Sequence, residues 1–221
     1  MATVHAQPDY QMQVKLPAPP GYPTTWVPDA RTAEPYGTFE SRRQELLAHI
    51  RRNPAPNNTK MAYYELARWA AGDEPHLGIF HAAMDFIDAR KDCSDFVLHS
   101  MIRLLYQFNP EPKSSKQKTE LFERARKTAL NFKYWPSEPG IDSMCTWTEN
   151  HHILFSSAAY LVGQKYPDAL FNNAGQTGRE KMAMNRPRIL RWLDLRFHTG
   201  FSEWLSHVYY DEDLTALLAL V

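Results

Sequence analysis

Apolar residues recur at helical spacing along most of this chain, and this periodicity constrains the fold more than any other feature. Stripes at offsets of three, four and seven each bury one face of a helix; the first two are Phe39, Leu46, Leu47, Ile50 and Leu77, Phe80, Met84, Ile87. Turn and stop signals separate the stripes, for example Asn53-Pro54-Ala55-Pro56 and Asn109-Pro110-Glu111-Pro112. The pattern predicts helices over 38–52, 58–71, 76–90, 93–108 and 115–133. Short loops join them, so we expect antiparallel hairpins, and no strand pattern competes.

Helical signals return after an irregular stretch over 134–145. Thr146 and Glu149 have the spacing of a capping box, which predicts a sixth helix to about Gln164. Thr177 and Glu180 repeat that spacing and predict a seventh helix to about His198, kinked at Pro187. An eighth helix is expected to begin near Asp213. The fold class that follows is all-α.

The two ends of the chain differ from its middle. Residues 1–37 hold seven of the 16 prolines and are predicted to form an extended arm, whose second half lies against the folded body. The last residues are apolar without a stop signal. We therefore expect 38–221 to be one helical domain truncated at its C-terminal end, with apolar side chains left uncovered for self-association: Leu214, Leu217, Leu218 and Val221.

Composition excludes several classes of protein. In 221 residues, 43% are hydrophobic, which requires a buried core. The 25 basic and 25 acidic residues balance, so the chain lacks the basic field of a nucleic-acid binder. Cys93 and Cys145 are predicted to be ordinary thiols. The sequence has no glycine-rich phosphate loop, and no cofactor is expected. No signal peptide or membrane-spanning run is found, so no membrane partner is expected and a cytoplasmic location is the default.

The densest group of polar and aromatic side chains is Trp147-Thr148-Glu149-Asn150-His151-His152. Asn150 shares an inward-facing stripe with Leu154, and a buried amide needs a partner or a ligand. One interpretation is that Asn150 and His151 only satisfy backbone groups of the preceding loop. The other predicts that both lie at the mouth of a pocket on the inner face.

The same segment resembles a known family. Asn150-His151-x-Ile153-Leu154, followed by Ala158-Ala159, Gly163 and Tyr166-Pro167-Asp168, is similar to a segment of heparinase II/III-like and alginate-lyase-like (α/α)-toroid polysaccharide lyases. Glu149 stands where that family has the first Asn of Asn-Asn-His. The resemblance implies part of an (α/α)-toroid, an incomplete barrel. It also implies cleavage of a uronic-acid-containing polymer by β-elimination.

The resemblance also suggests which side chains react. Lyases of this class combine an Asn, a His, an Arg and a Tyr, which here implies Asn150, His151, Arg196, His198 or His207, and Tyr209 or Tyr210. β-Elimination needs a neutralised carboxylate, a base and an acid, and these residue types supply them. We expect the segment 201–210 to cross the same pocket, with His207 or Tyr209 turned towards Asn150.

An anionic polysaccharide or oligosaccharide is the expected partner. Substrate-binding residues are predicted to be aromatic or polar groups near the same segments: Trp135, Trp147, Glu149, Glu203 and Trp204. The seventh helix adds a basic strip that could hold an anionic glycan or form a solvated face: Arg179, Arg186, Arg188, Arg191 and Arg196.

Three alternatives to a lyase remain open. A glycoside hydrolase on the same toroid could use Glu149, Glu203 and Asp211 as paired carboxylates. A metal site could combine Glu149 or Asp211 with the histidines His151, His152, His198 and His207. The sequence has no HExxH motif, however, and no metal is expected. The third alternative is a non-catalytic helical scaffold or glycan-binding module.

Overall fold

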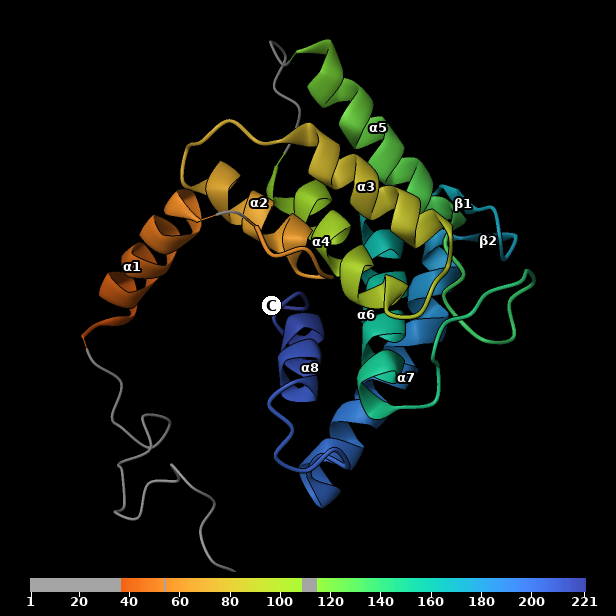
Figure 1. The fold of residues 1–221 in the computed structure, drawn as a ribbon. Coiled ribbons are helices and arrows are strands. Elements are labelled where there is room, and N and C mark those ends of the chain that lie inside the picture. The colour runs from red at the N-terminus through yellow and green to blue at the C-terminus, as the bar shows by residue number, and fades with distance from the viewer. Residues whose placement is uncertain (1–36, 54, 109–114) are drawn as a thin grey trace, which may run out of the picture. The chain divides into compact units, whose positions relative to one another are not determined.

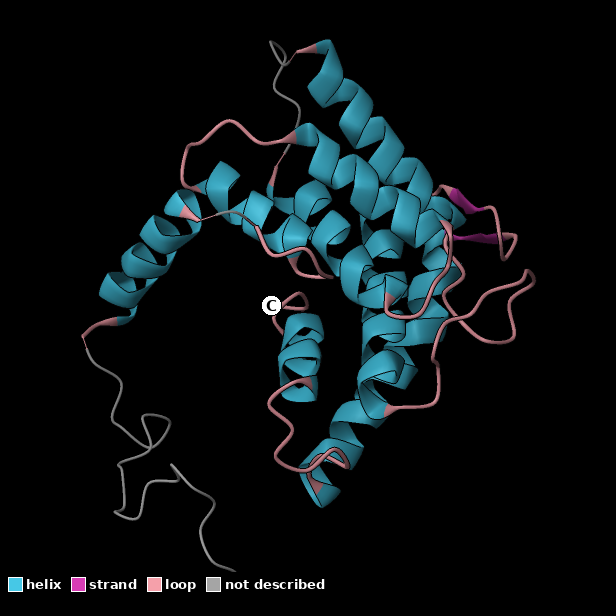
Figure 2. Cartoon of the chain, viewed as in Figure 1, coloured by secondary structure: helices cyan, strands magenta, loops and turns pink. Residues whose placement is uncertain are grey.

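The computed structural model describes residues 37–53, 55–108 and 115–221, and most of them are helical (Figures 1 and 2). The chain divides into two compact units, 1–42 and 43–221. In the first unit, residues 37–42 begin helix α1 (Phe39–Arg52), where the Thr38 hydroxyl accepts a hydrogen bond from the Ser41 amide at 3.1 Å. The expected arm lies outside the described residues up to position 36.

The second unit holds the remaining helices. They are α2 (Met61–Ala70), α3 (Leu77–Asp88), α4 (Ser94–Gln107), α5 (Lys116–Asn131), α6 (Glu149–Lys165), α7 (Gly178–Thr199) and α8 (Tyr209–Leu217). The predicted all-α class is confirmed. Contacts join α2 to α3, α3 to α4 and α5, α4 to α5, and α6 to α7. α8 begins at Tyr209, four residues before the predicted start near Asp213.

Helices α4 and α6 form the middle of the core. α4 packs against α2, α3, α5 and α6, and α6 packs against α4, α7 and α8. The largest apolar cluster includes Leu98 and Met101 of α4 and Phe155 and Ala158 of α6, all at most 1% exposed. A helix covered on several sides has little surface for polar side chains. Polar residues of α6 must therefore find partners inside the protein.

Two glycines allow α6 and α7 to pack closely. A Cβ atom at Gly163 would lie 2.5 Å from the carbonyl oxygen of Gly178, and one at Gly178 would overlap the carbonyl oxygen of Tyr166. α7 begins with the predicted capping box, since the Thr177 hydroxyl accepts from the Glu180 amide and Glu180 accepts from the Thr177 amide. Pro187 lies inside α7.

The other sequence-based capping box is wrong. Thr148, not Thr146, is the N-cap of α6, and its side chain makes no capping hydrogen bond. The Glu149 side chain instead accepts hydrogen bonds from the amides of Ser202 and Glu203, which follow α7. The expectation of no strands is also wrong, because Leu170–Phe171 (β1) pairs antiparallel with Gln176–Thr177 (β2). Strands of two residues are too short to produce an alternating pattern.

The apolar side chains of α8 divide between core and surface. Leu217 packs against a second apolar cluster around Ile153 and Trp192, whereas Leu214 and Leu218 are 51% and 59% exposed. None of the helices in the described part of the chain is long and apolar enough to cross a membrane.

Candidate functional site

Asn150 and His151 are buried in the first turn of α6, with 0% and 4% of their surfaces exposed. The Asn150 amide donates to Glu203 Oε2 at 2.7 Å, and its oxygen accepts from the Thr148 hydroxyl at 3.3 Å. Nδ1 of His151 lies 2.6 Å from Oδ2 of Asp95. The prediction that this pair lies at a pocket mouth is wrong, because α4 and α8 pack against α6 and protein groups take up both side chains.

Three carboxyl groups meet beside Asn150. One oxygen each of Glu149, Glu203 and Asp213 lies within 4.8 Å of the other two. We call these three residues the carboxyl cluster. They come from the start of α6, the segment between α7 and α8, and α8 itself. The contact between α6 and α8 brings them together.

Glu149 is held by donors on every side. Its carboxylate accepts from the backbone amides of Ser202 at 2.9 Å and Glu203 at 2.8 Å, and it forms an ion pair with Arg196. Its carbonyl oxygen accepts from the Trp192 indole at 2.8 Å. Glu149 therefore fixes the end of α7 and the segment after it to the start of α6. These contacts give Glu149 a positioning role, and substrate binding by Glu149 stays a prediction.

Asp213 is in the opposite situation. Its side chain is fully buried, and neither carboxyl oxygen has a hydrogen-bond partner among the described residues. Burial, together with the negative charge of Glu203, raises the pKa of Asp213 to about 7. Near neutral pH this carboxyl group therefore exists in both protonated and ionised forms. Such a group can give or take a proton under physiological conditions.

The predicted histidine and tyrosine partners of Asn150 lie elsewhere. His198 is exposed, and its Nδ1 lies 2.8 Å from the carbonyl oxygen of Asp194. His207 and Tyr209 are exposed as well, and Tyr210 uses its hydroxyl to accept from the Leu205 amide. The segment 201–210 reaches Asn150 through the side chain of Glu203 rather than by crossing a pocket. The expectation that His207 or Tyr209 faces Asn150 is wrong.

Exposed tryptophans stand next to the carboxyl cluster in the chain. Trp147 precedes Glu149 by two residues and is 77% exposed, and Trp204 follows Glu203 and is 73% exposed. Glu203 itself is partly exposed. Exposed aromatic rings beside a carboxylate suit a sugar, whose apolar face stacks on a ring while its hydroxyls remain hydrogen-bonded.

A cleft of about 390 Å³ runs between α6 and α7. Its lining includes Trp135, His152, Arg188 and Arg191 and reaches Leu195, the neighbour of Arg196. The Arg188 guanidinium lies 3.7 Å from the centre of the Trp135 ring. The cleft thus contains cationic and aromatic side chains. Its lining ends at the residue that precedes Arg196 in the chain, and Arg196 is the ion-pair partner of Glu149. Arg179 lies elsewhere, paired with Asp168 at 3.0 Å.

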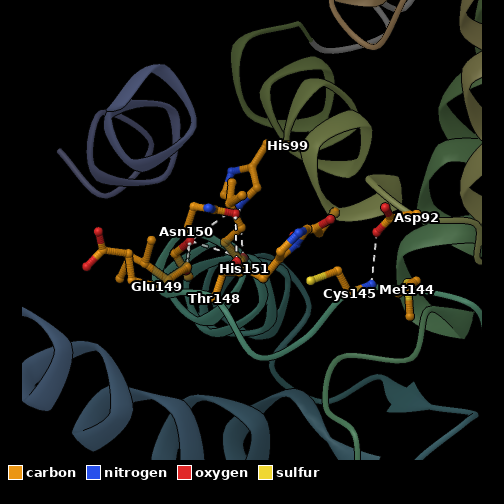
Figure 3. Close-up of polar contacts among 12 residues, drawn as sticks. Asp92, His99, Met144, Cys145, Thr148, Glu149, Asn150 and His151 are labelled. Carbon is orange, nitrogen blue, oxygen red and sulfur yellow. Dashed lines mark hydrogen bonds and ion pairs between the residues drawn. The ribbon is translucent and has the colours of Figure 1, made fainter. Parts of the chain in front are cut away.

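A second group of ionisable side chains surrounds His151. Asp92, Cys145 and His151 each offer an atom within 4.8 Å of the other two. Figure 3 shows Glu149 and Cys145 on opposite sides of the start of α6, so this group is separate from the carboxyl cluster. Burial raises the pKa of Asp95, and although burial by itself lowers the pKa of His151, the hydrogen bond and charge of Asp95 raise it.

The sequence reasoning missed Asp213, Asp92, Asp95 and Cys145. Asp211, which it considered, is exposed and pairs with Lys60 at 2.7 Å. Asp213 could have been recognised, because it shares a stripe with Ala216, Leu217 and Leu220 and so projects into the core. A carboxylate on such a stripe indicates a buried acid.

A comparison of the chain with protein-family models, with curated proteins and with solved structures finds no match.

Proposed function

We propose that this chain is a carbohydrate-active enzyme that cleaves glycosidic bonds at the carboxyl cluster. One observation carries the proposal: Asp213 is a fully buried carboxyl group without a partner among the described residues, has a pKa of about 7, and lies beside the partly exposed Glu203. A protonated carboxyl group next to a carboxylate is the pairing that glycoside cleavage requires.

In the hydrolytic mechanism, Asp213 protonates the glycosidic oxygen as the bond breaks. The carboxylate of Glu203 stabilises the positive charge that develops on the sugar, water then adds to the sugar carbon, and Asp213 takes back a proton from that water. Retaining glycosidases separate their two carboxyl groups by roughly 5–5.5 Å, inverting enzymes by roughly 6.5–9.5 Å. The nearest oxygens of Glu203 and Asp213 lie within 4.8 Å of one another, closer than the inverting separation. Because Asp213 is buried, this role requires a rearrangement on substrate binding that exposes Asp213 while Glu203 stays beside it.

The substrate proposed is an anionic polysaccharide. Arg188 and Arg191 in the cleft between α6 and α7 supply positive charge, and Trp135 supplies an aromatic surface. Guanidinium groups can bind sugar carboxylates in a bidentate manner. The exposed rings of Trp147 and Trp204 offer additional stacking positions.

β-Elimination of a uronic-acid polymer is the second candidate. The Asn150-His151 resemblance favours it, and Arg196 lies at the same cluster as Asn150 through Glu149. In this mechanism Glu203 or Asp213, rather than His207 or Tyr209, carries the proton, because those are the ionisable groups closest to Asn150 among the described contacts.

We also propose that the helices are part of an (α/α)-toroid. The contacts between successive helices, α2 with α3, α3 with α4, α4 with α5, and α6 with α7, support this arrangement. An experimental structure tests it: alternate helices should form an inner and an outer layer, and a single-layer bundle would contradict the toroid.

The test is to incubate the full chain with a panel of neutral and uronic-acid polysaccharides and to follow two signals. New reducing ends without ultraviolet absorbance indicate hydrolysis, whereas reducing ends with an absorbing unsaturated product indicate elimination. Asp211→Asn, at an exposed carboxylate, is the matched control for Asp213→Asn. Polymer binding without any new reducing ends would contradict an enzyme and favour the glycan-binding module.

A further inference from the structure

A cysteine, a histidine and an aspartate meet on the side of α6 away from Glu149. Asp92 lies in the turn between α3 and α4, Cys145 in the segment before α6, and His151 in the first turn of α6. Sγ of Cys145, a ring nitrogen of His151 and a carboxylate oxygen of Asp92 all lie within 4.8 Å of one another. Three separate segments thus contribute one donor atom each.

Hydrogen bonds hold these segments in place. The Cys145 amide donates to Oδ1 of Asp92 at 2.9 Å, a contact drawn in Figure 3, and the Ser143 amide donates to the carbonyl oxygen of Arg90 at 3.1 Å. Lys133 pairs with Asp142 at 2.5 Å in the same segment. The approach of Cys145 to the turn between α3 and α4 is therefore fixed in part by contacts that do not involve the three donor groups, those of Ser143 and Lys133.

Asp95 adds an independent observation. It is fully buried and accepts from Nδ1 of His151 at 2.6 Å, while its other oxygen has no partner within the described part of the chain. Metal-binding histidines commonly donate the proton of one ring nitrogen to a carboxylate, which orients the other nitrogen towards the metal. Asp95 is placed to orient His151 in this way. The stacking of the His151 ring on Phe96, with centroids 5.0 Å apart, also restricts its rotation.

We propose that Asp92, Cys145 and His151 bind a zinc ion, with Asp95 positioning His151. Thiolate, imidazole and carboxylate are the three ligand types that zinc takes in proteins. Zinc bonds of about 2.0–2.3 Å put tetrahedral ligand atoms roughly 3.3–3.8 Å apart, so the donors need to draw together by at most about 1.5 Å. Cys145 is partly exposed and Asp92 is exposed, which gives the ion a path to the site and leaves a fourth position for water.

The carboxylate of Asp92 argues against the main alternative, a cysteine nucleophile activated by His151. The Asp92 carboxylate is a ligand type for a cation and has no part in the reaction of a cysteine nucleophile. Zinc binding also uses every member of the group, since both the thiolate and the carboxylate become ligands.

The experiment is a titration of the metal-free full chain with Zn²⁺ and with Co²⁺. We expect one equivalent of either metal to bind, Zn²⁺ to raise the melting temperature, and Co²⁺ to give the absorption band of a thiolate bound to cobalt. Cys145→Ser should abolish that band and weaken Zn²⁺ binding at least tenfold. Cys93→Ser, at the other cysteine, should leave both unchanged.

Asp95→Asn tests the positioning role, since it keeps all three ligands and should weaken Zn²⁺ about 10- to 100-fold. Circular dichroism of each metal-free variant checks that it is folded. The proposal is wrong if wild-type protein binds no metal, or if Cys93→Ser and Cys145→Ser lose the cobalt band equally. Rapid alkylation of Cys145 that added Zn²⁺ fails to slow would instead support the nucleophile. None of these outcomes depends on glycan cleavage.

Discussion

Replacing Asp213 by Asn should change how stability depends on pH. The pKa of this carboxyl rises from an ordinary 3.8 to about 7 on folding. Because the folded protein holds the proton more tightly than the unfolded chain, stability is complete below the unfolded pKa and is lost as pH rises through the folded pKa. A difference of about 3 pKa units at about 1.4 kcal/mol each gives a loss of up to about 4 kcal/mol by pH 8.

Asn has the shape of a protonated aspartate and cannot ionise. We therefore expect Asp213→Asn to match the wild type within about 1 kcal/mol near pH 4 and to exceed its stability by up to about 4 kcal/mol near pH 8. Urea unfolding followed by tryptophan fluorescence across this pH range measures both curves. Asp211→Asn removes an exposed carboxylate paired with Lys60 and should change stability by about 0–1 kcal/mol at every pH. Parallel pH curves for wild type and Asp213→Asn would refute the reasoning.

Three other expectations concern packing and association. Gly178→Ala should cost about 1–3 kcal/mol in urea unfolding, because its Cβ would overlap a backbone carbonyl where α6 and α7 meet. Lys181→Met should cost about 3–5 kcal/mol in the same assay, because it leaves the carboxylate of Glu138 without its cation, and adding Glu138→Gln should recover part of the loss. We expect the wild type to self-associate in sedimentation velocity, and replacing the exposed Leu214 and Leu218 by Ser should reduce that association.

The helices could be predicted from the sequence, because each carries an apolar stripe that repeats over several turns. The start of α8 could not, because Tyr209 to Glu212 lack that stripe. Glu212 pairs with Lys60 before α2 at 2.7 Å, a contact between distant segments. The β1–β2 hairpin was missed because strands of two residues are too short to show an alternating pattern.

The candidate site was predicted in part. The sequence pointed to Asn150, His151, Glu149, Arg196 and Glu203, and the structure brings Asn150, Glu149, Arg196 and Glu203 together. It could not say that α4 and α8 bury the first turn of α6, because burial there depends on helices far away in the chain. The pairing of His151 with Asp95 was hidden for the same reason, since 56 positions separate them.

Glycosidic cleavage by wild type, Asp213→Asn and Asp211→Asn, measured as new reducing ends on the best polymer of the panel, tests the role of the carboxyl cluster most directly. Loss of a positioned acid or base typically slows a reaction about 10²- to 10⁴-fold. We expect Asp213→Asn to lose activity within that range and Asp211→Asn to retain that of the wild type. Equal cleavage by wild type and Asp213→Asn would contradict a catalytic role for the carboxyl cluster.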